Sequence, residues 1–406
     1  MKIITKYTKF LETMNTKDIK KISVNIPLPN DIIEVSNAYI KAGKDIFLVG
    51  GAVRDFIQGK EPKDWDLVTN ALPEESKEIL KGFKLSDEQG KNFGVLRLYT
   101  KDEPEGYEIA SYRKDISSGR DTKGDDQKVE MGKHITIFDD CMRRDLTMNA
   151  LFYDIKNKQI VDIVGGVDDI KNGVVRAVGN AMERFIEDRL RICRIFRFAA
   201  RTGGKIDGNT AKAIRTDNRL KGIGPKDDVS QERIFEEFKK AWKQALDFND
   251  YLNFFTEFDM WEQVFPGSNI NIELVESKDF VVVMSNLFKS ESTKGLEDKL
   301  VQDYKIPNSP ESGKIATQMV FLINLLGLTI DEVPEMYKKK VQCSIKDTTI
   351  LEWLDVNSIN DPVKIKFVEF RPTILSVDLI RKGFSGRELG QKIKEMEIEK
   401  FRDSLH

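Results

Sequence analysis

The chain has 406 residues, of which 40% are hydrophobic and 33% charged, and its formal net charge is −2. This length and balance predict a globular protein of two or more domains. Three cysteines without paired spacing indicate neither a disulfide framework nor a zinc site, and two histidines nearly exclude a Ser/His/Asp triad. Because we find no long apolar run and no signal-peptide pattern at the N-terminus, we expect no membrane partner and a cytoplasmic location, or an organellar one in a eukaryote.

A glycine turn follows the first strongly apolar segment. Ile46–Val49 is a run of apolar residues that ends at Gly50 and Gly51, which predicts a buried strand entering a tight turn. Helical spacing resumes over Ala52–Ile57, so the glycines lie at a helix N-terminus. Backbone there can approach a ligand closely, and its free N–H groups favour an anion. Arg54 adds a fork of donors that suits phosphate oxygens.

Two aspartates follow a proline at the start of a second predicted strand. In Asp64-Trp65-Asp66, period-two alternation places both carboxylates on one face. Two like charges in that arrangement favour a cation between them, and Mg²⁺ with carboxylate and phosphate oxygens fits. Taken singly, a Gly-Gly turn or an Asp-x-Asp pair is more often structural. Together and in this order they predict a nucleotidyl-transfer site, whereas the Gly-x-Gly-x-x-Gly spacing of a Rossmann site is absent.

This part of the chain resembles the head of the class II tRNA nucleotidyltransferases, the CCA-adding enzymes, in two motifs: Gly50-Gly51-Ala52-Val53-Arg54-Asp55 and Asp64-Trp65-Asp66-Leu67. That family shares a polymerase β-like core with bacterial poly(A) polymerases. The resemblance implies an α+β fold, in which a head with a small mixed sheet is followed by an all-helical neck, body and tail. We place the head at 1–170, the neck with its base-selecting helix at 171–250, the body at 251–335 and the tail at 336–406.

The rest of the head contains two more predicted strands and a loop. Residues 93–99 and 107–112 alternate as strands, and Glu108 on the second is a candidate third catalytic carboxylate. Residues 113–133 are polar and contain glycine, which predicts a mobile loop, although a disordered insertion would look the same. The family has a flexible loop here with an Arg near the position of Arg120. We hypothesise that this loop acts in the switch from CTP to ATP.

The segment from Met142 to Leu151 has two arginines followed by Asp and Asn, opposite an apolar face. This pattern suits recognition of a triphosphate and a ribose hydroxyl, although in isolation it is more often a surface ion pair. The family's ribose-recognition motif matches it closely. The resemblance therefore assigns ribose binding to Arg144, Asp145 and Asn149 and adds Arg143 to the triphosphate-binding residues.

Residues 162–170 resemble the family's hinge between head and neck, and residues 183–201 are predicted to form one long basic amphipathic helix. In that helix Asp188 and Arg191 are three apart and project from one face. An Asp accepts from an exocyclic amine while an Arg donates to ring acceptors, so the pair suits cytosine and adenine. Uracil or guanine would leave two acceptors opposed, at a cost of roughly 1–3 kcal/mol. The alternative is an ordinary surface ion pair; the resemblance favours base selection.

These observations predict an enzyme that adds C, C and A to tRNA 3′ ends without a template, from CTP and ATP, with two Mg²⁺ ions and release of pyrophosphate. Its partners would be the tRNA 3′ end and acceptor stem. Three alternatives stay open: an enzyme that adds only CC or only A, a poly(A) polymerase, and a non-catalytic tRNA-binding module. The site residues fall into five sets: catalytic Asp64, Asp66 and Glu108, the two aspartates being the metal ligands; triphosphate-binding Gly50, Gly51, Arg54 and Arg143; ribose-binding Arg144, Asp145 and Asn149; base-selecting Asp188 and Arg191; and supporting Arg113, Arg120 and Arg194.

Overall fold

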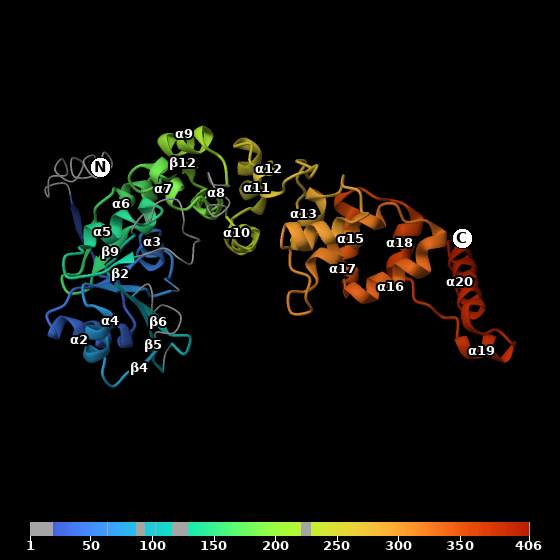
Figure 1. Ribbon diagram of the computed structural model, residues 1–406, viewed down its shortest axis with the longest axis horizontal. Helices are drawn as coiled ribbons and strands as arrows, with labels where there is room; N and C mark the ends of the chain where they lie inside the picture. Colours follow the sequence, from blue (N-terminus) through green and yellow to red (C-terminus); the bar gives the residue numbers. More distant parts are fainter. Residues whose placement is uncertain are drawn as a thin grey trace. The chain divides into compact units, whose positions relative to one another are not determined.

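The computed structural model describes residues 19–62, 64–86, 94–101, 103–115, 129–220 and 229–405 (Figure 1). The chain divides into two compact units. The first runs to Val229 and includes Gln244–Asp247, and the second comprises Ser230–Lys243 and the chain from Phe248 onward. The four-part division of the chain stays a prediction.

The first unit is built on a mixed sheet, with eight strands among the described residues, in the order β1-β10-β9-β2-β3-β6-β5-β4. Within this sheet β3 and β6 pair in parallel, whereas the other neighbours are antiparallel. The predicted strands at 46–49 and 107–112 are confirmed as β2 and β6. The strands are β1 Lys20–Ser23, β2 Ile46–Val49, β3 Leu67–Thr69, β4 Lys84–Ser86, β5 Val95–Tyr99, β6 Tyr107–Ser111, β9 Leu151–Asp154 and β10 Gln159–Asp162.

Helices cover both faces of this sheet, and alternate residues of its central strands enter two cores. Leu48 and Tyr153 join one core with side chains of α2, α3 and α6, whereas Val49 and Phe152 join another with side chains of α5. Burial on both faces explains why Ile46–Val49 is apolar throughout. The helices are α2 Asn30–Lys41, α3 Gly51–Ile57, α4 Pro73–Ile79, α5 Ile137–Met142, the 3₁₀ turn η4 Thr147–Asn149, and α6 Gly166–Lys171.

The single helix predicted over 183–201 is wrong, because the chain forms two helices, α7 Ala181–Glu187 and α8 Leu190–Thr202. Between them Asp188 has extended backbone, with φ −152° and ψ 105°. Its carboxylate accepts a hydrogen bond from the Leu190 N–H at 3.1 Å, at the start of α8. An Asp side chain that bonds nearby backbone competes with the helical ladder, which is the physical reason for the break.

Short strands also occur outside the large sheet. β11 (Val174–Val175) pairs in parallel with β12 (Lys205–Ile206), and α9 (Gly208–Thr216) follows. The sequence had predicted that residues 171–250 are entirely helical. The pairing of β11 with β12 shows that they are not. A second small ladder, β7 (Lys114–Asp115) with β8 (Val129–Glu130), lies at the two ends of the predicted loop.

The described residues of the second unit form helices joined by loops and contain no strand, which confirms the predicted succession of a mixed-sheet head and a helical remainder. One aromatic cluster is centred on Phe238 and Phe265, and another core contains Trp353 and Phe367. The helices are α10 Gln231–Gln244, α11 Phe248–Glu257, α12 Trp261–Val264, α13 Phe280–Leu287, α14 Leu296–Asp298, η5 Lys299–Asp303, α15 Ile315–Leu325, η6 Ile330–Glu332, α16 Val333–Cys343, α17 Asp347–Val356, α18 Pro362–Glu369, α19 Ser376–Arg381 and α20 Gly386–Asp403.

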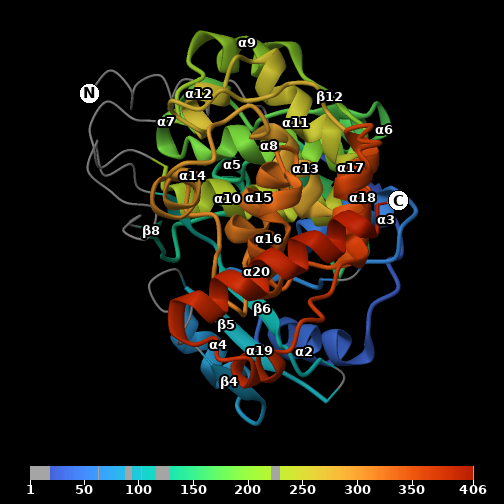
Figure 2. The same cartoon turned by 90° about the vertical axis from the view of Figure 1, so that its right-hand side faces the viewer.

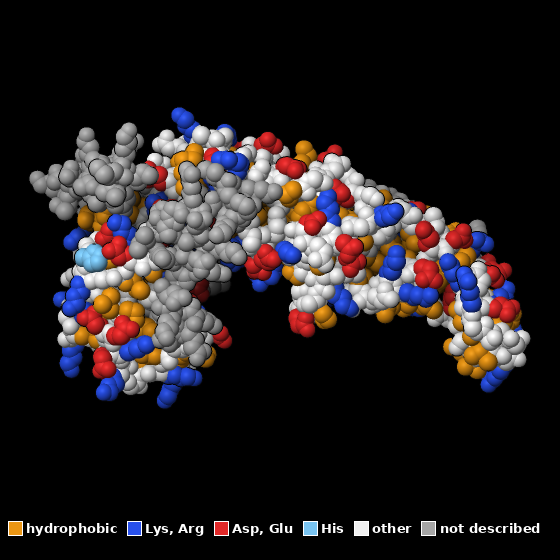
Figure 3. Space-filling view, viewed as in Figure 1, with side chains coloured by type: hydrophobic (Ala, Val, Ile, Leu, Met, Phe, Trp, Pro, Cys, Tyr) orange, Lys and Arg blue, Asp and Glu red, His pale blue; other side chains and the backbone are white. Residues whose placement is uncertain are grey.

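The last helix of this unit, α20, packs on α16 and α19 (Figure 2). Apolar side chains gather on the surface at α19 in Figure 3, where Leu375, Val377 and Ile380 are exposed. In the parts of the chain that the structure describes, no helix has both the length and the apolar character needed to cross a bilayer.

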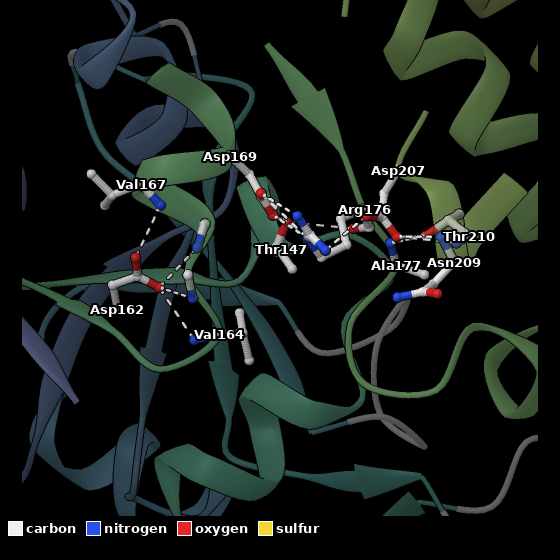
Figure 4. A network of polar contacts seen from close by, with 12 residues as sticks. Thr147, Asp162, Val164, Val167, Asp169, Arg176, Ala177, Asp207, Asn209 and Thr210 are labelled. Atoms are coloured by element: carbon white, nitrogen blue, oxygen red, sulfur yellow. Dashed lines mark hydrogen bonds and ion pairs between the residues drawn. The ribbon is translucent and has the colours of Figure 1, made fainter. Parts of the chain in front are cut away.

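A buried carboxylate organises the turn between β10 and α6. Asp162 is 2% exposed and accepts hydrogen bonds from the N–H groups of four residues, Val164, Gly165, Gly166 and Val167, at 2.8–3.2 Å (Figure 4). A Cβ on Gly166 would lie 2.2 Å from the carbonyl oxygen of Thr147, so this glycine permits the close approach of α6 to η4.

Replacing Asp162 by Ala should lower the free energy of unfolding by about 2–5 kcal/mol, because buried backbone donors lose their charged acceptor. Urea unfolding at pH 7 measures this change. As a matched control, Asp168→Ala removes an exposed carboxylate from α6, one that pairs with Lys20, and should change stability by less than about 1 kcal/mol. Equal losses in the two variants would contradict the role given to Asp162.

Candidate active site

The turn after β2 lies beside the start of β3. The Val49 N–H donates to the Asp66 carbonyl oxygen at 2.9 Å, which continues the pairing of β2 with β3 beyond Leu67. Gly50 has a φ of 69°, in the region that favours glycine, and the chain turns there into α3. Asp66 and the glycine turn are therefore neighbours in space, although they are separated in sequence.

The prediction that Asp64-Trp65-Asp66 begins a strand is wrong, because β3 starts at Leu67. β2 ends at Val49 and the chain turns away at Gly50, so β2 offers no backbone partner to Asp64 or Trp65. Period-two alternation consequently does not describe this segment. The contact that defines its position is the one between the Asp66 carbonyl and β2.

Asp66 occupies a partly buried position with excess negative charge. Burial raises the pKa of Asp66 to about 6, and the charges of Glu108 and Asp64 contribute. Arg144 and Arg97 act in the opposite direction. The parallel pairing of β3 with β6 brings Asp66 next to Glu108, which explains the repulsion between them. A cation bound here would relieve that repulsion.

The donor set at this position fits a magnesium ion that also binds a substrate. Within the described ranges, no group of three or more His, Cys, Asp or Glu side chains is placed to hold a metal. Glu108 is ion-paired with Arg97 at 2.6 Å, so we take Asp64 and Asp66, rather than Glu108, as the candidate metal ligands. Mg²⁺ is commonly held by one or two carboxylates together with waters and phosphate oxygens. The repulsion that raises the pKa of Asp66 agrees with such a site.

A buried aspartate that we did not single out in the sequence positions two of the arginines. Asp140 in α5 accepts a hydrogen bond from Arg143 at one carboxylate oxygen and from Arg144 at the other, both at 2.8 Å. Burial acts to raise the pKa of Asp140, but the charges of Arg144 and Arg143 outweigh it and hold that pKa below its usual value. Asp140 precedes Arg143 by three positions and Arg144 by four, near the end of a helix. This spacing is the sequence pattern by which the contact could have been predicted.

Arg143 and Arg144, which we call the clamped arginines because Asp140 binds both, lie near the glycine turn. Arg144 stacks over the Phe152 ring, 5.0 Å from its centroid, and its Nη1 would be 3.9 Å from a Cβ on Gly50. Burial lowers the pKa of Arg113 to about 10, and the positive charge of Arg143 contributes. Three guanidinium groups thus lie close enough to interact, which makes the region attractive to a polyanion.

Arg54 is more enclosed than the sequence suggested. It is 3% exposed, donates to Asp55 at 2.7 Å and to the Asn149 side chain at 2.5 Å, and lies over the Phe198 ring. Its Nη2 would be 3.6 Å from a Cβ on Gly51. Arg54 therefore links the glycine turn to the predicted ribose-binding residues, and its role toward the triphosphate stays a prediction.

The predicted ribose-binding residues form one connected group. Asp145 is ion-paired with Arg194 of α8 at 2.6 Å and accepts from the Leu146 N–H at 2.8 Å. Burial acts to raise the pKa of Asp145, but the charges of Arg194 and Arg191 and the hydrogen bonds to the carboxylate together hold that pKa below its usual value. Arg144 donates to the Asn149 carbonyl oxygen at 3.4 Å. The structure thus brings together Arg144, Asp145 and Asn149, with Arg194 as a supporting contact.

The two predicted base-selecting residues do not project from one helical face, because Asp188 lies at the break before α8. Arg191 is buried; it donates to Glu187 at 3.0 Å and to the Arg143 carbonyl oxygen at 3.2 Å. It also lies 4.0 Å from Asp115 of β7. Arg191, just after the helix break, therefore contacts the backbone of Arg143, one of the predicted triphosphate-binding residues. Glu187 and Asp115 are contacts that sequence spacing did not reveal.

The predicted supporting residue Arg120 belongs to the predicted loop at 113–133. Arg120 and the greater part of the loop at 113–133 lie outside the described residues. The described ends of that segment are the ladder of β7 and β8, which places Asp115 near Arg191.

Comparisons with known proteins identify the family of the chain. Residues 46–176 match the model of the poly A polymerase head domain. Poly(A) polymerase I of Escherichia coli O6:H1 is 33% identical over 232 residues, which make up 56% of this chain and 48% of that protein. The CCA-adding enzyme of Lactobacillus helveticus is 30% identical over 390 residues, 88% of this chain and 90% of the relative. The chain belongs to the CCA-adding enzyme family. It spans about half the length of the poly(A) polymerases that it matches.

Solved structures of CCA-adding enzymes have the same fold. The Bacillus stearothermophilus enzyme in complex with CTP aligns with a TM-score of 0.64 at 20% identity, covering 92% of each chain. The Thermotoga maritima enzyme complexed with tRNA aligns with a TM-score of 0.59 at 18% identity, covering 93% of this chain and 97% of the other. At these identities the likeness establishes the fold of this member of the CCA-adding enzyme family.

The raised pKa of Asp66 predicts a pH-dependent cost to stability. An ordinary Asp has a pKa of 3.8, so between that value and about 6 the folded protein keeps a proton that the unfolded chain has lost. Wild type should therefore lose stability relative to Asp66→Asn as pH rises through this window, by roughly 1–3 kcal/mol in total. Urea unfolding from pH 4 to pH 8 in the presence of a chelator measures the difference.

The matched control is Glu105→Gln, which removes an exposed negative charge from the turn before β6. A difference between wild type and Asp66→Asn that stays constant across the pH range would contradict the raised pKa.

Proposed function

We propose that this protein adds C, C and A to the 3′ ends of tRNAs, from CTP and ATP, without a nucleic acid template. The observation that carries the proposal is the position of Asp66 beside the Gly50 turn, with its raised pKa and the clamped arginines close by. An acidic pair next to a cationic cluster provides for a divalent cation and a triphosphate at once. Membership of the CCA-adding enzyme family supports this assignment of the chemistry.

In the proposed reaction the 3′-oxygen of the tRNA attacks the α-phosphorus of the incoming nucleotide. The bond from that phosphorus to the bridging oxygen breaks, pyrophosphate leaves, and the hydroxyl proton passes to solvent. Asp64 and Asp66 would hold two Mg²⁺ ions, which activate the hydroxyl and neutralise the leaving group when bound. Gly50 and Gly51 allow the phosphates to approach the start of α3.

The arginines and the ribose-binding group would orient the nucleotide around this centre. Arg143 and Arg144, held in place by Asp140, offer donors to the phosphates, and Arg113 adds positive charge. Asp145 and Asn149 offer oxygen acceptors for ribose hydroxyl groups. Because their positions are set by buried contacts, they need little rearrangement on binding.

Base choice would depend on Asp188 and Arg191. Arg191 is held by Glu187 and by the Arg143 carbonyl oxygen, which places base recognition next to phosphate recognition. Asp115 extends this contact to the end of the 113–133 segment. That connection is a physical route by which the segment would alter the pocket between C and A addition.

Poly(A) polymerase activity is the second candidate, because those relatives match the chain at 33% identity. Their alignment covers 56% of this chain, whereas the Lactobacillus helveticus CCA-adding enzyme aligns over 88%. The distinction requires tRNAs that lack CCA, that end in CC, or that are complete, each incubated with the four nucleotides singly and together. CC, then one A, then a stop supports our proposal; long A tails favour the polymerase, and addition of C or A alone a partial enzyme.

Asp66→Asn should reduce nucleotide incorporation into tRNA at least about a hundredfold, because a metal ligand at the reacting phosphorus is lost. Initial rates at saturating Mg²⁺ and CTP measure the effect. Glu105→Gln should retain the wild-type rate. Comparable activity in Asp66→Asn would exclude Asp66 from the catalytic centre.

Asp188→Ala should weaken the preference for CTP and ATP over UTP and GTP by roughly 5- to 150-fold, which corresponds to a cost of about 1–3 kcal/mol for opposed acceptors. The ratios of kcat/KM for the four nucleotides measure the change. Glu183→Ala, at an exposed position of α7, is the control. If Asp188→Ala lowered all four values equally, a role in base selection would be ruled out.

A further inference from the structure

An extended segment, residues 174–178, lies between the predicted ribose-binding residues and the region of α9. On one side the Arg176 carbonyl oxygen accepts from the Thr147 N–H at 3.0 Å, and the Val178 N–H donates to the Asp145 carbonyl oxygen at 3.1 Å. On the other side, β11 pairs with β12, and the Ala177 N–H donates to the Thr210 hydroxyl at 3.2 Å. We call residues 174–178 the connecting segment.

The Arg176 side chain links both sides of this segment a second time. It donates to Asp169 of α6 from Nε at 3.0 Å and from Nη2 at 3.1 Å, and to Asp207 from Nη1 at 2.8 Å. Figure 4 shows Arg176 between the two aspartates. Asp169 and Asp207 are largely buried, whereas Arg176 itself is 41% exposed. One guanidinium is thus ion-paired with two carboxylates from different parts of the chain.

Each of these carboxylates has a second partner. Asp169 accepts from the Thr147 hydroxyl at 2.6 Å, and Asp207 caps α9 by accepting from the N–H groups of Asn209 and Thr210. Thr147 begins η4, whose last residue is Asn149, and it follows Asp145 by two positions. Arg176 therefore contacts, through Asp169, the turn that carries the predicted ribose-binding side chains.

Close packing leaves that turn little freedom. A Cβ atom added to Gly166 would lie only 2.2 Å from the Thr147 carbonyl oxygen, so α6 and η4 are in tight contact. Asp145 is also joined to α8 by its ion pair with Arg194. A shift of α6 or α9 would therefore be transmitted to Asp145 and Asn149 rather than absorbed.

We propose that Arg176 is a positioning residue for sugar recognition: by holding Asp169 and Asp207 together, it fixes Thr147, and with it Asp145 and Asn149, relative to the start of α9. This inference rests on the proposed function, in which Asp145 and Asn149 recognise the ribose. Arg176 itself touches no substrate in this scheme. Its effect appears as discrimination between a ribonucleotide and its 2′-deoxy analogue.

The test is equilibrium binding of CTP and of 2′-deoxy-CTP to the full chain without tRNA. Arg176→Met, which keeps the aliphatic part of the side chain, should reduce the ratio of the two affinities by about tenfold. Arg176→Lys should give an intermediate ratio, since an ammonium lacks the fork that spans both carboxylates. Asp207→Asn should lower the ratio as well, while Asn retains the ability to cap α9.

The matched control is Lys20→Met, which breaks an exposed ion pair with Asp168, the residue next to Asp169 in α6. It should leave the ratio unchanged. Thermal unfolding of every variant separates a loss of discrimination from a loss of folding. If Arg176→Met and Asp207→Asn weakened both nucleotides equally, or left the ratio at the wild-type value, the proposal would be overturned.

The binding assay also separates this inference from the proposed function. A wild-type protein that prefers CTP to 2′-deoxy-CTP but adds nothing to tRNA would refute the proposed activity, and the ratios in the variants would still decide the role of Arg176. A wild type that binds both nucleotides equally would overturn the inference directly.

Discussion

The clamp of two guanidinium groups by one buried carboxylate is the interaction on which the rest of the site depends. Arg143 and Arg144 are adjacent in sequence and repel each other, and Arg113 adds a third positive charge. Asp140, a buried residue of α5, gives each of the adjacent pair a fixed partner. Buried charges are stable only when they are paired and hydrogen-bonded. The clamp thus allows positive charge to be concentrated near Gly50 without unfolding the segment.

The opposite charge is concentrated a short way along the sheet, and it is compensated less completely. Glu108 has Arg97 as its partner, whereas Asp66 has a raised pKa because burial and two neighbouring carboxylates disfavour its charge. A protein retains such a position when binding offsets the cost. The positive cluster of arginines is compensated by Asp140, whereas the negative charge around Asp66 is compensated less completely. This difference distinguishes the predicted phosphate-binding residues from the predicted metal ligands.

Two turns in this chain share the pattern of a strand, two glycines and a helix, yet they differ in what their N–H groups meet. Before Gly165 and Gly166, the carboxylate of Asp162 already occupies the start of α6. Before Gly50 and Gly51 the residue in the corresponding place is Phe47, and no side chain caps α3. When the protein's own carboxylate already binds the N–H groups at a helix N-terminus, those groups cannot bind a phosphate. The motif therefore acquires its meaning from the residue three positions before it.

The sequence alone determined the strand at Ile46–Val49, the turn after it, the family and the sets of candidate residues, because burial periodicity and local turn chemistry are properties of neighbouring positions. It failed at the helix break, where the Asp188 side chain competes with the backbone, and at Asp64–Asp66, where the partner strand ends. Only the tertiary structure decided which charges meet. Arg54 reaches Asn149 across 95 positions, and Arg176 reaches Asp207 across 31. Such pairs depend on how distant elements pack, and no local pattern of residues records that packing.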